Sequence, residues 1–131
     1  MKILVVEDDF ISRQILVENL SAYGVCHVAV NGLEMLEAVE IAWANRAPYD
    51  LILLDIMMPG MDGQQALQRL RAKEQERGIG GSKMAKVIMT TALDDPQQVM
   101  TSFMKGGCEA YLVKPIDFLK LKETIRDLGL A

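Results

Sequence analysis

Residues 51–55 read Leu-Ile-Leu-Leu-Asp, and the loop Ile-Met-Met-Pro-Gly-Met-Asp-Gly follows at once over residues 56–63. A short apolar run bounded by turn residues is typical of a strand buried on both faces of a parallel sheet. Asp55 therefore lies at the carboxyl end of such a strand, where open α/β sheets place their functional groups. The sequence predicts a strand over residues 51–54 and a functional carboxylate at Asp55.

A second apolar run, residues 3–6, ends in the same way with Glu7, Asp8 and Asp9. Two strands thus deliver several acids to one edge of a sheet, where carboxylates raise each other's pKa unless a cation lies among them. Oxygen ligands of this kind suit Mg²⁺, and we expect Mn²⁺ to be able to substitute for it. We interpret Asp9 as the N-cap of the following helix rather than as a metal ligand.

Strand and helix patterns alternate along the whole chain, which predicts an α/β fold with helices on both faces of a parallel sheet. Asp62 is a predicted N-cap, and Gly24 is a predicted stop for the first helix. We expect strands at residues 2–6, 25–30, 51–54, 86–90 and 110–113, and helices at 10–23, from 32, from 62 to about 77, from 94 to 106 and from 117 to the end.

Composition excludes several classes of function. The 131 residues suit one domain, and a net charge of −4 disfavours a nucleic-acid surface, because phosphates would be repelled. No apolar run approaches the ~18 residues of a membrane-spanning helix, and no signal peptide precedes the acids. Cys26 and Cys108 lack metal-site spacing. We expect a cytoplasmic protein with reduced cysteines and no membrane insertion.

Four motifs together resemble the CheY-like receiver domain of two-component response regulators. They are Val-Glu-Asp-Asp at 6–9, Asp55 with Met-Pro-Gly-Met-Asp-Gly at 58–63, Thr-Thr-Ala at 90–92, and Tyr-Leu-Val-Lys-Pro at 111–115. The resemblance covers nearly the whole chain in order. It implies a flavodoxin-like (βα)5 three-layer sandwich, with a five-stranded parallel sheet of order 2-1-3-4-5. Residues 1–131 would form one receiver domain.

The resemblance also implies a chemistry for the acids. Asp55 would accept a phosphoryl group from a sensor histidine kinase or a histidine phosphotransfer protein. Asp8 would bind Mg²⁺ directly and Glu7 would assist, while Asp55 and the backbone carbonyl of Met57 would complete the protein ligands. The chain would not be a turnover enzyme. A dehalogenase-type hydrolase would need an acid two residues after Asp55, where Met57 stands.

Other residues receive roles by the same resemblance. Lys114 would pair with Asp55 and then with a phosphoryl oxygen, and Pro115 would follow a cis peptide bond. Thr91 rather than Thr90 would donate its hydroxyl to the phosphoryl group. Tyr111 would be the aromatic switch residue that turns inward.

Two apolar side chains, Met57 and Leu93, flank the expected path of the attacking water and cannot orient it by hydrogen bonding. We therefore expect slow autodephosphorylation.

The predicted fourth helix, fifth strand and fifth helix would form the surface for a downstream protein partner, and the protein would be a monomer or weak dimer. We expect a stand-alone regulator without direct nucleic-acid contact, and a segment cut from a longer regulator is the alternative.

Overall fold

The computed structural model describes residues 1–91 and 107–131 and contains a parallel five-stranded sheet of order β2-β1-β3-β4-β5. Its strands and helices, with one 3-10 turn (η1), are β1 Lys2–Val6, α1 Phe10–Leu20, β2 Val25–Ala29, α2 Gly32–Ala44, β3 Leu51–Asp55, α3 Gly63–Glu76, η1 Gly81–Lys83, β4 Lys86–Thr91, β5 Ala110–Val113 and α5 Phe118–Asp127. The predicted fold class and strand order are confirmed.

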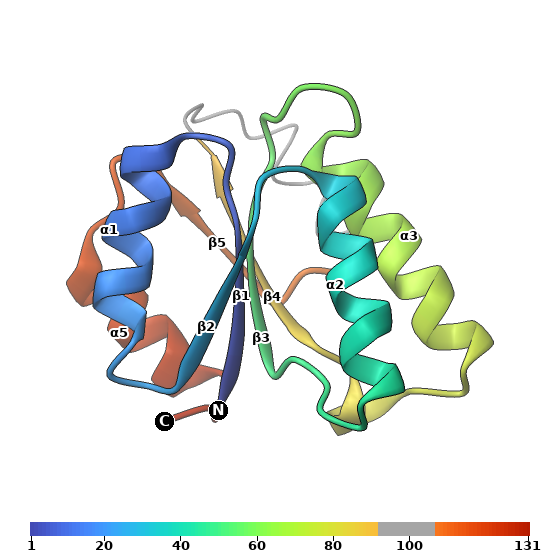
Figure 1. Ribbon diagram of the computed structural model, residues 1–131. Coiled ribbons are helices and arrows are strands. Elements are labelled where there is room, and N and C mark those ends of the chain that lie inside the picture. Colours follow the sequence, from blue (N-terminus) through green and yellow to red (C-terminus); the bar gives the residue numbers. More distant parts are fainter. Residues whose placement is uncertain (92–106) are drawn as a thin grey trace.

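Helices cover both faces of the sheet (Figure 1). Helices α1 and α5 lie on one face, where Leu16 and Leu121 pack against apolar side chains of the central strands. Helices α2 and α3 lie on the other face, where Leu36 and Leu67 pack against Leu54 and its neighbours. Because β1 and β3 are central and covered on both sides, nearly all their residues are buried, which explains their unbroken apolar runs.

Side-chain caps fix where the helices begin. Asp9, Asn31, Asp62 and Asp117 are the N-caps of α1, α2, α3 and α5, and each accepts a backbone N–H from the first turn. Asp62 forms a capping box with Gln65. The predicted capping roles of Asp9 and Asp62 are confirmed. The carboxylate of Asp9 is therefore bonded to its own helix, whereas Glu7 and Asp8 lie at the edge of the sheet.

The first helix differs from the prediction. It ends at Leu20 with Ser21 as its C-cap, three residues before the predicted end at residue 23. Gly24 is needed for another reason: a Cβ there would lie 1.9 Å from the carbonyl oxygen of Met1. Not every apolar residue of the helices is buried, because Ile11 of α1 and Leu33 of α2 are largely exposed.

Strand ends differ by one residue from the prediction. Strand β2 ends at Ala29, β3 includes Asp55 and β4 includes Thr91. The predicted helix over residues 94–106 and the predicted lifetime residue Leu93 lie outside the described residues. Within the described part of the chain, no helix has the length and apolar character needed to cross a membrane.

Candidate functional site: an acidic cluster with one lysine

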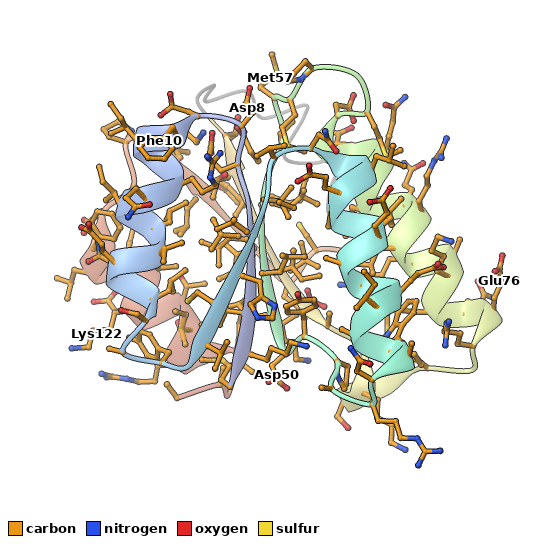
Figure 2. The ribbon with its side chains drawn as sticks, in the orientation of Figure 1. Asp8, Phe10, Asp50, Met57, Glu76 and Lys122 are labelled. Carbon is orange, nitrogen blue, oxygen red and sulfur yellow. The ribbon has the colours of Figure 1, made fainter. Side chains whose placement is uncertain are left out.

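The acids meet because β1 and β3 are neighbours in the sheet. The register pairs Val6 with Leu54, so Glu7 and Asp55 emerge side by side from the strand ends. One carboxylate oxygen from each of Glu7, Asp8 and Asp55 lies within 4.8 Å of the other two. Glu7 and Asp55 are only 1% and 3% exposed, whereas Asp8 is open to solvent (Figure 2). The cluster thus has a buried floor and one accessible acid.

Lys114 enters this cluster from the end of β5. Its Nζ donates to Glu7 Oε2 at 2.6 Å and to Asp55 Oδ2 at 3.1 Å. Its backbone N–H donates to the carbonyl oxygen of Thr91 at 2.6 Å, which fixes the strand end beside β4. The Lys114–Pro115 peptide bond is cis, as the resemblance implied. One ammonium group is therefore shared between two buried carboxylates.

Burial and pairing shift the pKa values of this group in a consistent way. Burial raises the pKa of Glu7, and the hydrogen bond from Lys114 offsets only part of that effect. Burial alone lowers the pKa of Lys114, but its hydrogen bond to Glu7 and the charge of Asp55 raise that pKa overall. The lysine is therefore held firmly in its charged form, while the carboxylates carry more negative charge than it neutralises.

The second oxygen of Asp55 is held by the loop that follows. The backbone N–H of Met57 donates to Asp55 Oδ1 at 3.1 Å. The loop folds back so that Gly63 N–H donates to the carbonyl oxygen of Ile56. A Cβ on Gly63 would lie 2.3 Å from the carbonyl oxygen of Asp55, so this position leaves no room for a side chain. The start of α3 is thereby packed directly against the acid-bearing strand end.

The remaining predicted residues lie around this centre. Thr90 and Thr91 are both buried at the end of β4, and Thr90 pairs with Asp55 in the sheet register. The side chains of Met57 and Tyr111 are about half exposed. Thr91 ends β4 and Met57 follows the end of β3, so both lie at the same edge of the sheet as the acids, whereas Tyr111 lies within β5 in register with Met89.

One residue near the cluster was missed from sequence. Arg13 of α1 reaches back to donate from its Nη1 to the backbone carbonyl of Glu7 at 2.9 Å. The backbone N–H of Asp9 also donates to Glu7 Oε1 at 3.1 Å. The acid-bearing turn is therefore supported from its own helix, and the only sequence signal for it was a basic residue one turn into α1.

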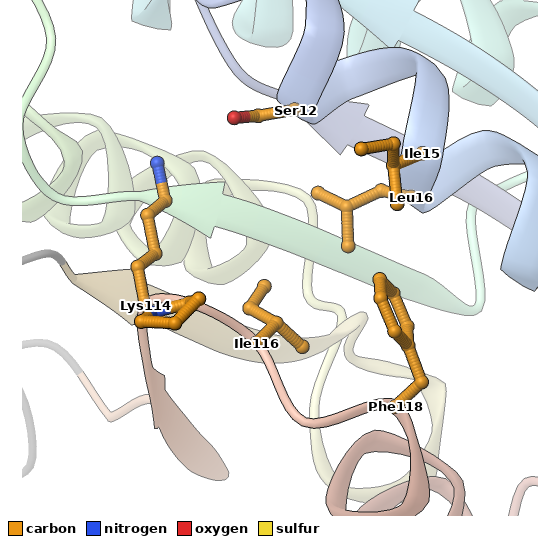
Figure 3. A pocket seen from close by; sticks show the side chains of 7 residues that line it. Ser12, Ile15, Leu16, Lys114, Ile116 and Phe118 are labelled. Carbon is orange, nitrogen blue, oxygen red and sulfur yellow. The ribbon is translucent and has the colours of Figure 1, made fainter.

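An apolar cavity of about 450 Å³ lies beside Lys114, between α1 and the segment that leads into α5 (Figure 3). Leu16, Ile116 and Phe118 form its apolar wall, and the ammonium group of Lys114 points away from that wall (Figure 3). The acidic cluster therefore has an apolar neighbour on one side.

Comparison with known proteins identifies the family. The sequence model of the response regulator receiver domain family matches residues 3–126, nearly the whole chain. This chain belongs to the response regulator receiver domain family. A curated relative of this receiver is the transcriptional regulatory protein HprR of Escherichia coli, 36% identical over 96% of this chain and 50% of HprR. This chain spans half or less of the length of the curated relatives that were compared.

Solved receiver structures agree with the fold. The receiver domain of the Arabidopsis thaliana histidine kinase CKI1, complexed with Mg²⁺ and BeF₃⁻, has a TM-score of 0.84 and 27% identity over 99% of this chain and 90% of that chain. The receiver domain of Ssk1 from Saccharomyces cerevisiae, crystallised with the histidine phosphotransfer protein Ypd1, has a TM-score of 0.80 and 28% identity. That match covers 98% of this chain and 88% of the other.

The acids of this receiver fit a magnesium ion by the chemistry of their donors. Glu7, Asp8 and Asp55 offer only oxygen atoms, which Mg²⁺ prefers, and the exposed Asp8 leaves a side open to water. The excess negative charge of the cluster over the single ammonium of Lys114 favours a further cation at this point. The arrangement can hold a divalent cation and an anionic group at the same edge of the sheet.

Proposed function

We propose that this receiver accepts a phosphoryl group on Asp55 and thereby acts as a response regulator in a two-component phosphorelay. One observation carries the proposal: Asp55 is a buried carboxylate at a strand end, with Lys114 Nζ 3.1 Å from one oxygen and Met57 N–H 3.1 Å from the other. Buried aspartates held by a fixed cation beside further acids suit phosphoryl transfer, where positioning and charge neutralisation supply most of the catalysis.

In the proposed reaction, an oxygen of Asp55 attacks the phosphorus of a phosphohistidine. The new oxygen–phosphorus bond forms as the nitrogen–phosphorus bond breaks, and the imidazole leaves with that electron pair and takes up a proton from water. Lys114 moves its hydrogen bond from Asp55 to a phosphoryl oxygen, and the Thr91 hydroxyl donates to another. The acyl phosphate on Asp55 then carries the signal.

Asp8 and Asp55 would hold Mg²⁺ with Glu7 and the backbone carbonyl of Met57, and Mn²⁺ would substitute for it. When bound, Mg²⁺ supplies positive charge that offsets the repulsion between the carboxylates and the incoming phosphoryl group. Lys114 is shared between Glu7 and Asp55, and it would exchange its bond to Asp55 for one to the phosphoryl group. Phosphorylation should therefore depend on both the metal and the lysine.

The phosphodonor is a sensor histidine kinase or a histidine phosphotransfer protein, a proposal supported by the likeness to the Ssk1 receiver crystallised with Ypd1. The chain works in the cytoplasm as a monomer or weak dimer and turns over no substrate. The apolar Met57, with Leu93, keeps the acyl phosphate long-lived.

The structural change that follows phosphorylation would pass through Thr91 and Tyr111 to the exposed side of β5 and α5. Tyr111 and Val113 are 41% and 38% exposed on β5, which leaves apolar surface for a partner protein. Inward rotation of Tyr111 after phosphorylation would change the shape of this surface. The predicted fourth helix, which the proposal includes, lies outside the described residues.

Intact-protein mass after incubation with acetyl phosphate tests the proposal. Wild type with Mg²⁺ should gain about 80 Da, one phosphoryl group. Protein without Mg²⁺ and the Asp55→Asn variant should gain nothing. Asp50→Asn is the matched control, because it removes an exposed aspartate at the opposite end of β3 and should leave the adduct unchanged.

Rapid hydrolysis can hide an adduct, so binding of beryllofluoride with Mg²⁺ is measured beside it. A beryllofluoride complex with wild type and none with Asp55→Asn supports the site even when the adduct is short-lived. Absence of both from wild type overturns the proposal. A constitutive interaction module would then be the better reading.

A further inference from the structure

A second cavity, of about 320 Å³, lies at the opposite end of the sheet from Asp55. Asp50 and Lys86, which stand at the amino ends of β3 and β4, are part of its lining. Figure 2 places Asp50 at one end of the molecule and Asp8 and Met57 at the other. The strand rise puts about 16 Å between the two ends. A ligand in this cavity would not touch the acidic cluster.

The walls of this cavity are largely apolar and aromatic. Trp43, near the end of α2, and Tyr49, just before β3, contribute rings. Ile79 and Met84, from the connection between α3 and β4, contribute aliphatic surface. A concave apolar site of this size is at the lower end of the range that small organic ligands occupy. The shape and lining therefore suit the body of a compact ring system.

The charge of the cavity is positive. Lys83 and Lys86 both line it. Within residues 1–91 and 107–131, neither lysine makes an ion pair, although Lys73 and Lys114 each pair with a glutamate. Both lysines therefore line the cavity without an ion-pair partner among the described residues, although the Asp50 carboxylate lines it too. Their charge favours an anion in this cavity.

Two further cations contact the aromatic walls. The guanidinium carbon of Arg77 lies 4.6 Å from the ring centroid of Trp43, and Lys2 Nζ lies 4.6 Å from that of Tyr49. The one acid in the lining, Asp50, already accepts the backbone N–H of Lys2 at 2.8 Å. Among the described residues named here, four cations and the Asp50 carboxylate therefore lie in or beside the lining, although the whole chain has a net charge of −4.

We propose that this cavity binds a small organic anion, namely a carboxylate or sulfonate attached to one or two fused rings. The rings would lie against Trp43 and the aliphatic wall, and the anionic group would pair with Lys83 and Lys86. Weak, charge-selective binding is expected, with a Kd of about 0.1–1 mM for a ligand of some 13 heavy atoms. The proposal does not depend on phosphorylation of Asp55.

The test uses 2-naphthoate as the probe and proton–nitrogen NMR spectra of the full chain as the readout. The chain has a single tryptophan, so its indole signal reports on the wall directly. Saturable shifts of the Trp43 indole and of residues 82–86 are expected. The neutral isostere 2-naphthalenemethanol should bind at least tenfold more weakly, and added salt should weaken only the naphthoate.

Paired variants separate local from overall charge. Lys83→Gln with Lys86→Gln should weaken naphthoate binding about tenfold or more. Lys120→Gln with Lys122→Gln, which removes the same charge from exposed positions on α5, should leave it unchanged. Equal binding of the neutral isostere, shifts confined to other residues, or no saturable shift in wild type would each overturn the proposal. Asp55→Asn should bind the probe as wild type does, which keeps this test separate from that of the proposed function.

Discussion

Two buried clusters at opposite ends of the sheet have the same formal charges but different cations. At the carboxyl end, Glu7 and Asp55 share the ammonium of Lys114. At the amino end, Glu74 and Glu109 share the guanidinium of Arg71. Glu7 and Glu74 are almost equally buried, at 1% and 2% exposed. The number of charges and the burial of these two glutamates therefore do not distinguish the clusters, although the side chain of Glu109 is 23% exposed and that of Asp55 only 4%.

The difference lies in how many hydrogen bonds hold the cation of each cluster, although the buried Nε of Arg71 has no hydrogen-bond partner among the described residues. Arg71 donates to Glu74, to Glu109 and to the backbone carbonyls of Ala85 and Gly107. Backbone N–H groups of Ala85 and Val87 donate to the two glutamates as well. A planar guanidinium fixed by so many bonds ties α3 to the starts of β4 and β5.

Within residues 1–91 and 107–131, the side chain of Lys114 makes two hydrogen bonds, both to carboxylates, and a third acid, Asp8, lies beside them. An ammonium on a flexible stem can exchange one oxygen for another, whereas the Arg71 network has to break as a whole. The cluster with a third acid nearby and an exchangeable cation is therefore the one suited to receive a ligand.

The largest effect is expected from Arg71→Met. The variant leaves Glu74 and Glu109 without their cation, and the free energy of unfolding should fall by about 3–5 kcal/mol. Lys73→Met is the control from the same helix, because its pair with Glu40 is on the surface and should be worth under about 1 kcal/mol. Urea unfolding measures both. A loss for Arg71→Met no larger than that for Lys73→Met would show that the network is not structural.

Lys114→Met should slow the phosphorylation of Asp55. At saturating Mg²⁺, the initial rate of adduct formation with acetyl phosphate should fall about 100-fold, because the fixed positive charge at the phosphoryl group is lost. Lys120→Met, an exposed lysine on α5, should leave the rate unchanged. Rates are followed by intact mass over time. A rate within threefold of wild type would contradict the proposed role of Lys114.

The smallest effect is expected from Glu7→Gln. This variant should raise the free energy of unfolding, whereas Arg71→Met should lower it. Burial raises the pKa of Glu7, so the folded state binds this proton more tightly than the unfolded state does. Ionisation therefore costs stability as pH rises from the ordinary value near 4.3 through the raised pKa. In metal-free buffer, Glu7→Gln should be more stable than wild type by about 1 kcal/mol at pH 7 and equal to it below about pH 4.

Urea unfolding at both pH values, with a chelator present, checks this prediction. Glu123→Gln, an exposed glutamate on α5, is the control and should show no gain at either pH. A loss of stability for Glu7→Gln at pH 7 would mean that Lys114 is matched to Glu7 rather than shared with Asp55.

Sequence alone was sufficient where a residue's role is set by its own strand or helix end. The apolar runs before Glu7 and Asp55 located the two strands, and the parallel topology then brought the acids together. Asp9 and Asp62 were identified as caps because capping depends on only the next three residues.

The rest depended on contacts between distant segments. Residues 73–77 read as a highly charged helix end, yet Glu74 is buried, because it follows Leu67 and Leu70 at helical spacing and meets Arg71 and Ala85. The helical spacing was a usable signal. The partner Glu109 lies 38 residues from Arg71, and nothing in the local sequence pairs them.

The contact between Glu7 and Lys114 joins residues 107 positions apart, almost the full length of the chain. Contacts of such long range require the intervening chain to be ordered first, and they are slow to form in folding. A nascent chain in which β5 and Lys114 have not yet been synthesised contains the three acids but not the lysine that pairs with them. Phosphoryl acceptance as proposed, which needs Lys114, would therefore begin only after the chain has folded at least through β5.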